Sequence, residues 1–242
     1  MIYIQSNLSK TRAHNFAAAC AQFGAIASGT DYKYVTQTEV ADGKYDLLIK
    51  RNLFVGSTDF MRLVFSRVNL QLKPLPLNEI MEYESTTLGE ALSRVNSGEN
   101  LFVKPYEVKL FSGFVPTPNS AYSLRSIPLD IPVWVCSAFR APLIAEWRVY
   151  VVQGKIKYVG QYFGEYVGYN WDYFLSPLFE RKDLPSAFVV DVGLINDGRV
   201  SEPVLIEFGD MVAIDNYGWD NEEYLNALKL RYKEIKIGRA HV

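Results

Sequence analysis

Two apolar runs, residues 187–193 and 203–208, flank an Asn-Asp-Gly tripeptide at residues 196–198. This tripeptide is typical of a tight turn, because Asn, Asp and Gly tolerate the backbone conformations that hairpin turns need. The runs therefore predict two adjacent strands. Each carries one acid, Asp191 in the first and Glu207 in the second. An ionised carboxylate in an apolar strand is unfavourable without a compensating cation, so this pair constrains the fold and its chemistry together.

A shared divalent cation is the interpretation that we favour for these two acids. In nucleotide enzymes Mg²⁺ is usually bound by one or two carboxylates together with substrate phosphates. The sequence therefore predicts Asp191 and Glu207 as Mg²⁺ ligands. The alternative is that each acid pairs with an arginine or faces solvent on a half-exposed sheet.

Hydrophobic spacing predicts the other elements of the chain. Further strands are predicted at residues 2–4, 45–50, 101–104, 113–115, 133–136, 146–152 and 155–160. Helices are predicted at residues 11–23, where Gly24 would end the helix, and at 88–95 and 221–233. We expect the strands at 101–104 and 113–115 to pair as a hairpin, and likewise those at 146–152 and 155–160. This mixture indicates the α+β class.

Composition shifts divide the chain into three lobes and a tail. Residues 1–72 are predicted to form a small N-terminal α/β lobe, which ends where Pro74 and Pro76 stiffen the connection. A small hairpin-rich lobe is predicted at 73–136, and a larger antiparallel-sheet lobe at 137–237. Residues 238–242 lack a packing pattern and are expected to be a tail.

The segment from Lys104 to Gly113 suggests a phosphate-binding loop. Lys104 ends a predicted strand, Lys109 lies in the loop that follows, and Ser112 and Gly113 close it. Ammonium groups neutralise phosphate charge best at close range in a partly enclosed site. Small residues such as Ser112 and Gly113 would let backbone N–H groups approach the phosphates. The alternative, usual for an isolated pair of lysines, is that both are solvated beside a β-turn.

Three more features allow two interpretations each. Glu146 and Arg148 are two residues apart and share a strand face, so they could form a surface ion pair, or Arg148 could reach a phosphate in a cleft. The aromatic segment 158–173 fits internal packing better than a rim for the acceptor substrate. Arg51 could orient a substrate carboxylate, although a solvated basic edge fits equally well.

Charge and composition disfavour several classes of function. A net charge of -2 and a pI near 5.8 disfavour a nucleic-acid-binding protein, which needs a basic surface. Cys20 and Cys136 lack metal-ligand spacing and indicate free thiols in a reducing compartment. The N-terminus has no signal-peptide pattern, and no apolar run approaches the ~20 residues that span a bilayer. We therefore expect a cytoplasmic protein without a membrane segment.

Four motifs in a fixed order resemble those of the ATP-grasp superfamily. They are Phe-Val-Lys-Pro with its lysine- and glycine-containing loop, Glu-x-Arg-Val, Val-Asp-Val and Ile-Glu-Phe, spread over residues 100–220. The loop Lys-Leu-Phe-Ser-Gly-Phe-Val and the closing segment at residues 214–218 look most like a divergent clade that is common in bacteriophages and bacteria. That clade is distantly similar to a eukaryotic translation-initiation assembly factor.

The resemblance implies the ATP-grasp fold, in which two antiparallel-sheet lobes enclose ATP after a small N-terminal α/β lobe. It implies Arg148 and Lys109 as catalytic residues. It also implies that ATP and Mg²⁺ are bound, with Asp191, Glu207 and Asp210 as metal ligands. The residues implied to bind the nucleotide are Lys104, Lys109, Ser112, Gly113, Trp134, Val135, Cys136, Glu146 and Arg148.

The reaction that the resemblance implies is an ATP-dependent carboxylate–amine ligation. The γ-phosphoryl group passes to a carboxylate, and an amine then displaces phosphate from the acyl phosphate; the acceptor is an unidentified carboxylate, amine or peptide. Such chemistry needs cations rather than a nucleophilic side chain, which suits a chain with only two histidines.

The chain departs from the family at one metal position. The usual metal strand ends Glu-x-Asn, whereas Gly209 stands in place of the Asn here, and Asp210 is the candidate for the missing oxygen. This departure keeps open a non-catalytic ATP-binding module that acts in assembly or regulation. An ATP-dependent phosphotransferase is a third possibility.

Overall fold

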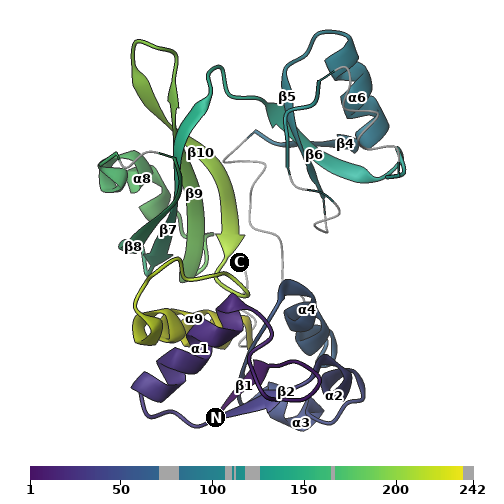
Figure 1. Ribbon diagram of the computed structural model, residues 1–242, viewed down its shortest axis with the longest axis vertical. Coiled ribbons are helices and arrows are strands. Elements are labelled where there is room, and N and C mark those ends of the chain that lie inside the picture. The colour runs from purple at the N-terminus through teal and green to yellow at the C-terminus, as the bar shows by residue number, and fades with distance from the viewer. Residues whose placement is uncertain (71–81, 107–110, 112, 118–125, 165–166, 237–242) are drawn as a thin grey trace. The chain divides into compact units, whose positions relative to one another are not determined.

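The computed structural model describes residues 1–70, 82–106, 111, 113–117, 126–164 and 167–236 (Figure 1). The chain divides into two compact units. Unit 1 comprises Met1–Leu75, Ile144–Leu194 and Pro203–Val242, and unit 2 comprises Pro76–Leu143 and Ile195–Glu202. Among the described helices, none has the length and apolar character that a bilayer crossing requires.

The N-terminal part of unit 1 is a three-stranded parallel sheet with helices. Its strands are β1 (Ile2–Gln5), β2 (Tyr32–Val35) and β3 (Leu53–Val55), in the order β2-β1-β3. Its helices are α1 (Phe16–Ala27), α2 (Gln37–Ala41), α3 (Asp46–Ile49) and α4 (Thr58–Ser66). Parallel strands need crossover connections, which these helices supply.

The strand predicted at residues 45–50 is wrong, because helix α3 occupies this segment. Tyr45 and Ile49 are buried, whereas Leu47 is 90% exposed. Burial at positions four apart is the helical period, while a strand would have placed Leu47 on the same face as its two neighbours. The buried strand instead follows at β3.

Helix α1 begins and ends later than predicted. Asn15 caps it, because the Asn15 side chain accepts a hydrogen bond from the Ala18 N–H at 3.0 Å. Gly24 does not end the helix but lies inside it. A Cβ on Gly24 would lie 2.1 Å from the Asn221 backbone oxygen, so this glycine lets α1 pack closely against α9 (Asn221–Lys236) (Figure 1).

The second sheet of unit 1 has the order β10-β9-β7-β8. Its strands are β7 (Leu143–Val152), β8 (Lys155–Gly164), β9 (Ala187–Asn196) and β10 (Ser201–Asp210), and α8 (Trp171–Phe179) lies between β8 and β9 in sequence. The predicted hairpin of β7 and β8 is confirmed, as is the adjacency of β9 and β10. The short connections between these consecutive neighbours make the sheet antiparallel.

One hydrophobic core joins the two sheets of unit 1. It contains Ile4 of β1, Ala21 of α1, Tyr150 of β7, Val189 of β9 and Leu228 of α9. The first seventy residues and the larger sheet therefore share a core, whereas the sequence analysis assigned them to separate lobes.

Unit 2 is a three-stranded antiparallel sheet with one helix on it. Its strands are β4 (Glu84–Thr87), β5 (Leu101–Pro105) and β6 (Pro132–Ser137), in the order β4-β6-β5, and its helix is α6 (Leu88–Asn96). The expected hairpin partner of β5, at residues 113–115, forms only an isolated bridge between Phe114 and Val103. The sheet partner of β5 is β6, because Val133 and Val135 complete the core under α6.

Candidate functional site

Arg148 of β7 and Asp191 of β9 form a two-point ion pair in unit 1. The Arg148 Nε and one terminal nitrogen each donate a hydrogen bond of 2.7 Å to a different carboxylate oxygen of Asp191. The side chains are only 16% and 8% exposed, respectively. The apolar strand therefore contains a carboxylate that is compensated by an arginine, which is the alternative that the sequence left open.

Tyr217 supports the guanidinium group from a second direction. The Arg148 guanidinium carbon lies 4.9 Å from the centre of the Tyr217 ring, and Tyr162 stacks on Tyr217 at 5.2 Å. Gly160 is paired with Arg148 across β7 and β8, and a Cβ on it would lie 2.9 Å from Tyr217. The glycine thus gives Tyr217 the space to approach Arg148.

The segment that carries Tyr217 is fixed by several hydrogen bonds. Tyr150 donates to the Asp215 carbonyl, Tyr224 to the Ile214 carbonyl, and Tyr158 to the Tyr217 carbonyl. Tyr217 also has a φ of 42°, a left-handed conformation that is uncommon outside glycine. A strained residue held in place by its surroundings is typical of functional sites.

Arg148 and its neighbours differ in their pKa from free side chains. Burial alone would lower the pKa of Arg148, but the hydrogen bonds and charge of Asp191 raise it. Burial raises the pKa of Tyr162, and the nearby charges of Asp191 and Glu146 raise it further, with Glu146 also accepting a hydrogen bond from Tyr162. Arg148 is therefore a permanent cation, and Tyr162 is a permanent hydrogen-bond donor at neutral pH.

Glu207 lies on the same sheet face as Asp191. A Cβ on Gly209 of β10 would lie 2.7 Å from the Val189 side chain of β9, so these two positions are neighbours. Side chains alternate along strands, so two residues further on β9 and two residues back on β10 give Asp191 and Glu207 as neighbours on this face. Glu207 is exposed, whereas Asp191 is buried.

Gly209 explains the missing family asparagine in steric terms. A Cβ at this position would meet Val189 at 2.7 Å and Ile214 at 3.3 Å. Real Cβ atoms essentially never approach to 2.7 Å, so an asparagine would push β10 away from β9 or displace Ile214. Residue 209 therefore supplies no side-chain metal ligand here.

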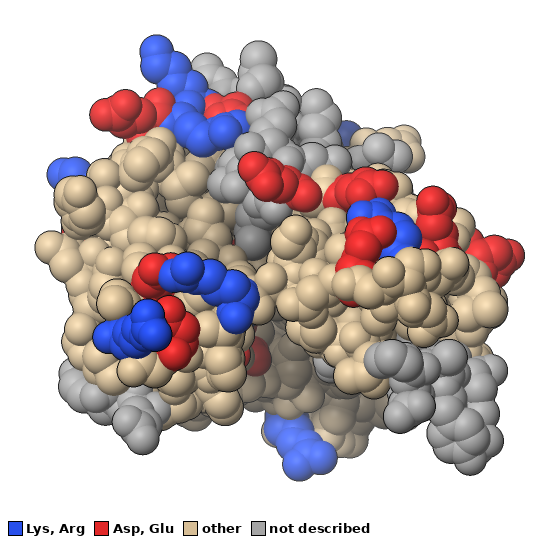
Figure 2. Space-filling view, turned by 90° about the horizontal axis from the view of Figure 1, so that it is seen from above, with Lys and Arg blue, Asp and Glu red and all other residues tan. Residues whose placement is uncertain are grey.

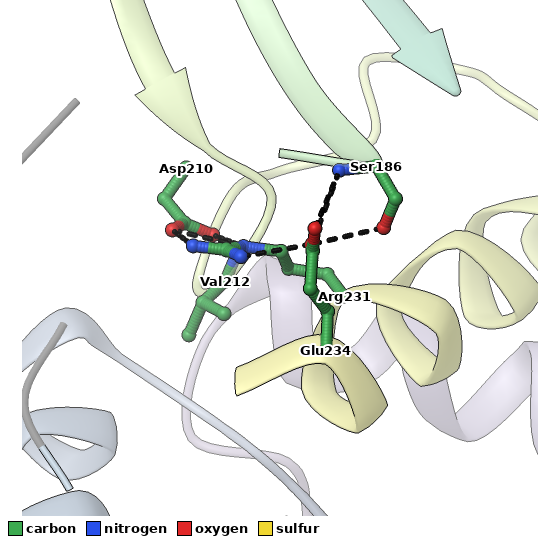
Figure 3. Close-up of polar contacts among 5 residues, drawn as sticks. All are labelled: Ser186, Asp210, Val212, Arg231 and Glu234. Atoms are coloured by element: carbon green, nitrogen blue, oxygen red, sulfur yellow. Dashed lines mark hydrogen bonds and ion pairs between the residues drawn. The ribbon is translucent and has the colours of Figure 1, made fainter. Parts of the chain in front are cut away.

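Asp210, the third predicted metal ligand, lies in a different ion pair. Arg231 of α9 is fully buried and donates to both Asp210 oxygens, at 3.0 and 3.1 Å from its Nε (Figure 3). Arg231 also donates to Glu234 at 2.9 Å, and Glu234 accepts hydrogen bonds from the Ser186 N–H and hydroxyl. This network attaches α9 to the ends of β9 and β10, and it occupies the oxygens that a metal would need.

A Mg²⁺ ion fits Asp191 and Glu207 only in part. Among the described residues, no group of three or more His, Cys, Asp or Glu side chains is placed to hold a metal ion. Mg²⁺ keeps several waters and often needs only one or two carboxylates with substrate phosphates. A carboxylate has about four lone-pair sites, so Asp191 keeps acceptor capacity beside Arg148. The two acids therefore suit a Mg²⁺ ion that arrives with phosphate and water ligands.

Lys104 lies on the face of the unit 2 sheet opposite α6. It is paired with Trp134 across β5 and β6, and its ammonium nitrogen lies 4.6 Å from the centre of the Tyr83 ring. Trp134 is 9% exposed and stacks on Tyr106 at 4.5 Å, and Cys136 lies two residues along the same face. Burial raises the pKa of the Cys136 thiol, against opposing effects of a Tyr83 hydrogen bond and the Lys104 charge.

The remaining predicted nucleotide ligands have mixed placements. The Val135 side chain is 1% exposed in the core under α6, which leaves only its backbone to contact a base. Gly113 packs on Phe102, because a Cβ there would lie 2.4 Å from the ring. Lys109 and Ser112 lie outside the described residues, so their roles stay predictions.

Tyr217 and Tyr162 are the site residues that sequence reasoning missed. Tyr217 lies in the closing segment 214–218 and Tyr162 in the aromatic segment 158–173, and neither was given a role. The available signal was the run of Tyr and Gly residues near a buried-strand arginine, a composition that suits cation–π contacts.

Surface charge does not suggest a nucleic-acid-binding face. Figure 2 shows acidic and basic side chains side by side among the described residues of one face, such as Arg94 between Glu84 and Glu99. A nucleic-acid site needs a field of one sign, because phosphate neutralisation dominates its affinity.

Comparison with known proteins identifies the site's context. A family described as an ATP-grasp domain, the second family of its clade, matches residues 82–227, more than half of the chain. The fold is similar to D-alanine–D-alanine ligase from Bacillus anthracis, with a TM-score of 0.56 and 10% identity over 98% of each chain. It is also similar to a RimK domain ATP-grasp protein from Sphaerobacter thermophilus, with a TM-score of 0.53 and 14% identity over 94% of this chain and 98% of that one. Among curated proteins, none matches the sequence.

Proposed function

Because the chain belongs to the ATP-grasp superfamily, as a member of that clade family, we propose that it is an ATP-dependent ligase of the carboxylate–amine type. Its fold is the α+β ATP-grasp fold, as predicted. The observation that carries the proposal is the rigid cation at Arg148. Asp191 fixes it in two places and Tyr217 lies against it, while Glu207 lies on the same face.

Arg148 is suited to stabilise phosphoryl transfer. Phosphoryl transfer depends on positioning and charge neutralisation more than on covalent catalysis. A guanidinium group that is already oriented and partly desolvated loses little entropy when a phosphate binds. One terminal nitrogen of Arg148 makes no hydrogen bond to the described residues, so it is left to donate to a phosphoryl oxygen.

In the proposed reaction, a substrate carboxylate oxygen attacks the γ-phosphorus of ATP, and the bond to the β-phosphate oxygen breaks to release ADP. An amine then attacks the acyl carbon, inorganic phosphate leaves with the C–O bond electrons, and the amine loses a proton. We propose Lys104 as a phosphate contact and Asp191 with Glu207 as the Mg²⁺ ligands. Mg²⁺, when bound, would neutralise phosphate charge.

A non-catalytic ATP-binding module is the second candidate, and two observations favour it. Gly209 leaves no space for the usual asparagine ligand, and both oxygens of Asp191 already bind Arg148. Either change would weaken a two-metal site. An assembly or regulatory factor, the role suggested by the distant eukaryotic resemblance, would need binding without turnover.

The test is mass spectrometry of peptides and small metabolites incubated with the protein, Mg²⁺ and ATP, with ADP and phosphate measured in parallel. A ligase should form ADP, phosphate and a product lighter by one water than its two substrates. Lys104→Ala and Arg148→Ala should abolish the product, and Lys155→Ala, at an exposed lysine, should not.

The outcomes separate the candidates. ADP with a phosphorylated product and no free phosphate would identify a phosphotransferase. ATP binding without ADP formation would identify the binding module. Product that persists in Arg148→Ala would overturn the role of the arginine.

A further inference from the structure

A cavity of about 200 Å³ lies in unit 1 at the amino-terminal ends of β1 and β3. Ile2 and Leu53, the first residues of these parallel strands, line it together with side chains from α9. Ligands of open parallel sheets usually bind at the carboxyl ends of the strands. This cavity is therefore at the opposite edge from the usual ligand position of such a sheet, and no residue of the Arg148 cluster lines it.

The charged side chains of the cavity all have the same sign. Arg51 comes from the loop before β3, and Lys229, Lys233 and Lys236 come from α9. The lining contains no Asp or Glu. None of the four cations has an acidic partner among the residues that the structure describes. A cluster of this sign is unexpected in a chain whose net charge is -2.

The three lysines lie on one strip of α9, because positions three and four apart are neighbours on a helix. Like charges at this spacing repel one another. The nearby acid, Glu234, does not relieve this repulsion, since its carboxylate binds Arg231 and Ser186 (Figure 3). The cavity therefore has unbalanced positive charge.

The helix dipole accounts for only part of this arrangement. A helix C-terminus favours cations in its last turn, where Lys233 and Lys236 lie. Lys229 is beyond that turn, and Arg51 belongs to another segment of the chain. Arg51 and Lys229 converge on the cavity for a reason other than the dipole.

One wall of the cavity is well ordered for binding. Tyr232 is 2% exposed, and its hydroxyl donates to the Ile49 carbonyl at 3.3 Å. The Lys236 ammonium lies 4.9 Å from the centre of the Tyr232 ring. Partial burial lowers the pKa of Lys236, so its charge is incompletely solvated and would gain from a bound anion.

We infer that this cavity is a binding site for a small multivalent anion of the phosphate type. Its volume is below the roughly 300 Å³ at which pockets for drug-sized ligands begin, which suits a small anion. Three ammonium groups and one guanidinium group offer the donors that phosphoryl oxygens accept. The site is separate from the proposed ATP site and does not depend on the proposed ligase activity.

The test is isothermal titration with inorganic diphosphate at constant ionic strength and without Mg²⁺. The wild-type chain and the Lys104→Ala variant should bind one diphosphate per chain with equal affinity. The double variant Arg51→Gln/Lys233→Gln should bind roughly tenfold more weakly or not at all. The control double variant Lys155→Gln/Lys182→Gln removes the same charge from positions elsewhere and should bind like wild type.

Two results would overturn the inference. Equal weakening in both double variants would show a general charge effect. Loss of binding in Lys104→Ala would show that diphosphate occupies the proposed ATP site instead. Both positions of the test variant are exposed, and circular dichroism with the single variant Arg51→Gln separates lost binding from lost folding.

Discussion

The ion pair between Arg148 and Asp191 can be assigned separate structural and chemical roles at the residue scale. Removing one partner leaves an uncompensated charge in a site where the two side chains are 16% and 8% exposed. Asp191→Asn should therefore lower the free energy of unfolding by about 3 kcal/mol. The double variant Arg148→Met/Asp191→Leu should recover most of that loss in urea denaturation while remaining inactive. Recovery of activity in the double variant would contradict a chemical role for Arg148.

Tyr45 offers a second prediction at this scale. Its hydroxyl is the sole buried side-chain polar atom without a hydrogen-bond partner among the described residues. Burying an unpaired hydroxyl costs about 1–3 kcal/mol, so Tyr45→Phe should stabilise the protein by about 1 kcal/mol and raise Tm by ~2–4 °C. Tyr224→Phe is the matched control, because the Tyr224 hydroxyl donates to the Ile214 carbonyl at 2.5 Å and its loss should destabilise. A lower Tm for Tyr45→Phe would show that its hydroxyl is paired.

Individual acids could be located from the sequence, but their partners could not. Asp191 and Glu207 were recognised because carboxylates are rare in apolar strands. The arginine that compensates Asp191 is 43 positions away in the chain, and only the strand order β9-β7 brings them together. The same limit applies to Asp210, whose partner Arg231 is buried on a helix that the sequence described only by its apolar face.

At the scale of elements, the contact between α1 and α9 depends on Gly24. Gly24→Ala would place a methyl group 2.1 Å from the Asn221 oxygen, so the helices must separate. Overpacking of this kind should lower the free energy of unfolding by about 1–3 kcal/mol, measured by urea denaturation. Gly168→Ala is the matched control, since no atom lies within 4 Å of its added Cβ. Equal stability of the two variants would show that the helices adjust freely.

Elements with a strong local signal were predictable, whereas those defined by distant contacts were not. The hairpin of β7 and β8 has a Gln-Gly turn between two apolar strands, and it was predicted with nearly correct bounds. Segment 45–50 has an equally apolar sequence, but only contacts with Tyr3 and Phe54 reveal that Tyr45 and Ile49 are buried at helical spacing. Gly24 resembled a helix end because its packing partner is far away in the sequence.

At the scale of the whole molecule, acid stability depends on Glu39. Its partial burial would raise its pKa, but hydrogen bonds from Lys10, Lys44 and the Thr36 N–H lower the pKa to about 2. A pKa below that of the unfolded chain, ~4.3, means that the stabilisation is present above that value and is lost as the pH falls toward 2.

Glu39→Gln should therefore lower stability by about 1 kcal/mol or less at neutral pH, and it should flatten the loss of stability between about pH 5 and pH 2. Urea denaturation across this pH range measures both effects. Glu222→Gln, at an exposed acid on α9, should leave the pH dependence unchanged. A Glu39→Gln curve parallel to wild type would show that its ion pairs do not persist in solution.

The most direct test of the nucleotide site is calorimetric titration of the intact chain with ATP and Mg²⁺. We predict one ATP bound per chain, with affinity reduced roughly tenfold or more in Lys104→Ala and in Arg148→Ala and unchanged in Lys155→Ala. Circular dichroism and thermal melting confirm that each variant is folded. A folded wild-type chain that does not bind ATP, or one whose affinity is the same in all three variants, would contradict the assignment of the nucleotide site.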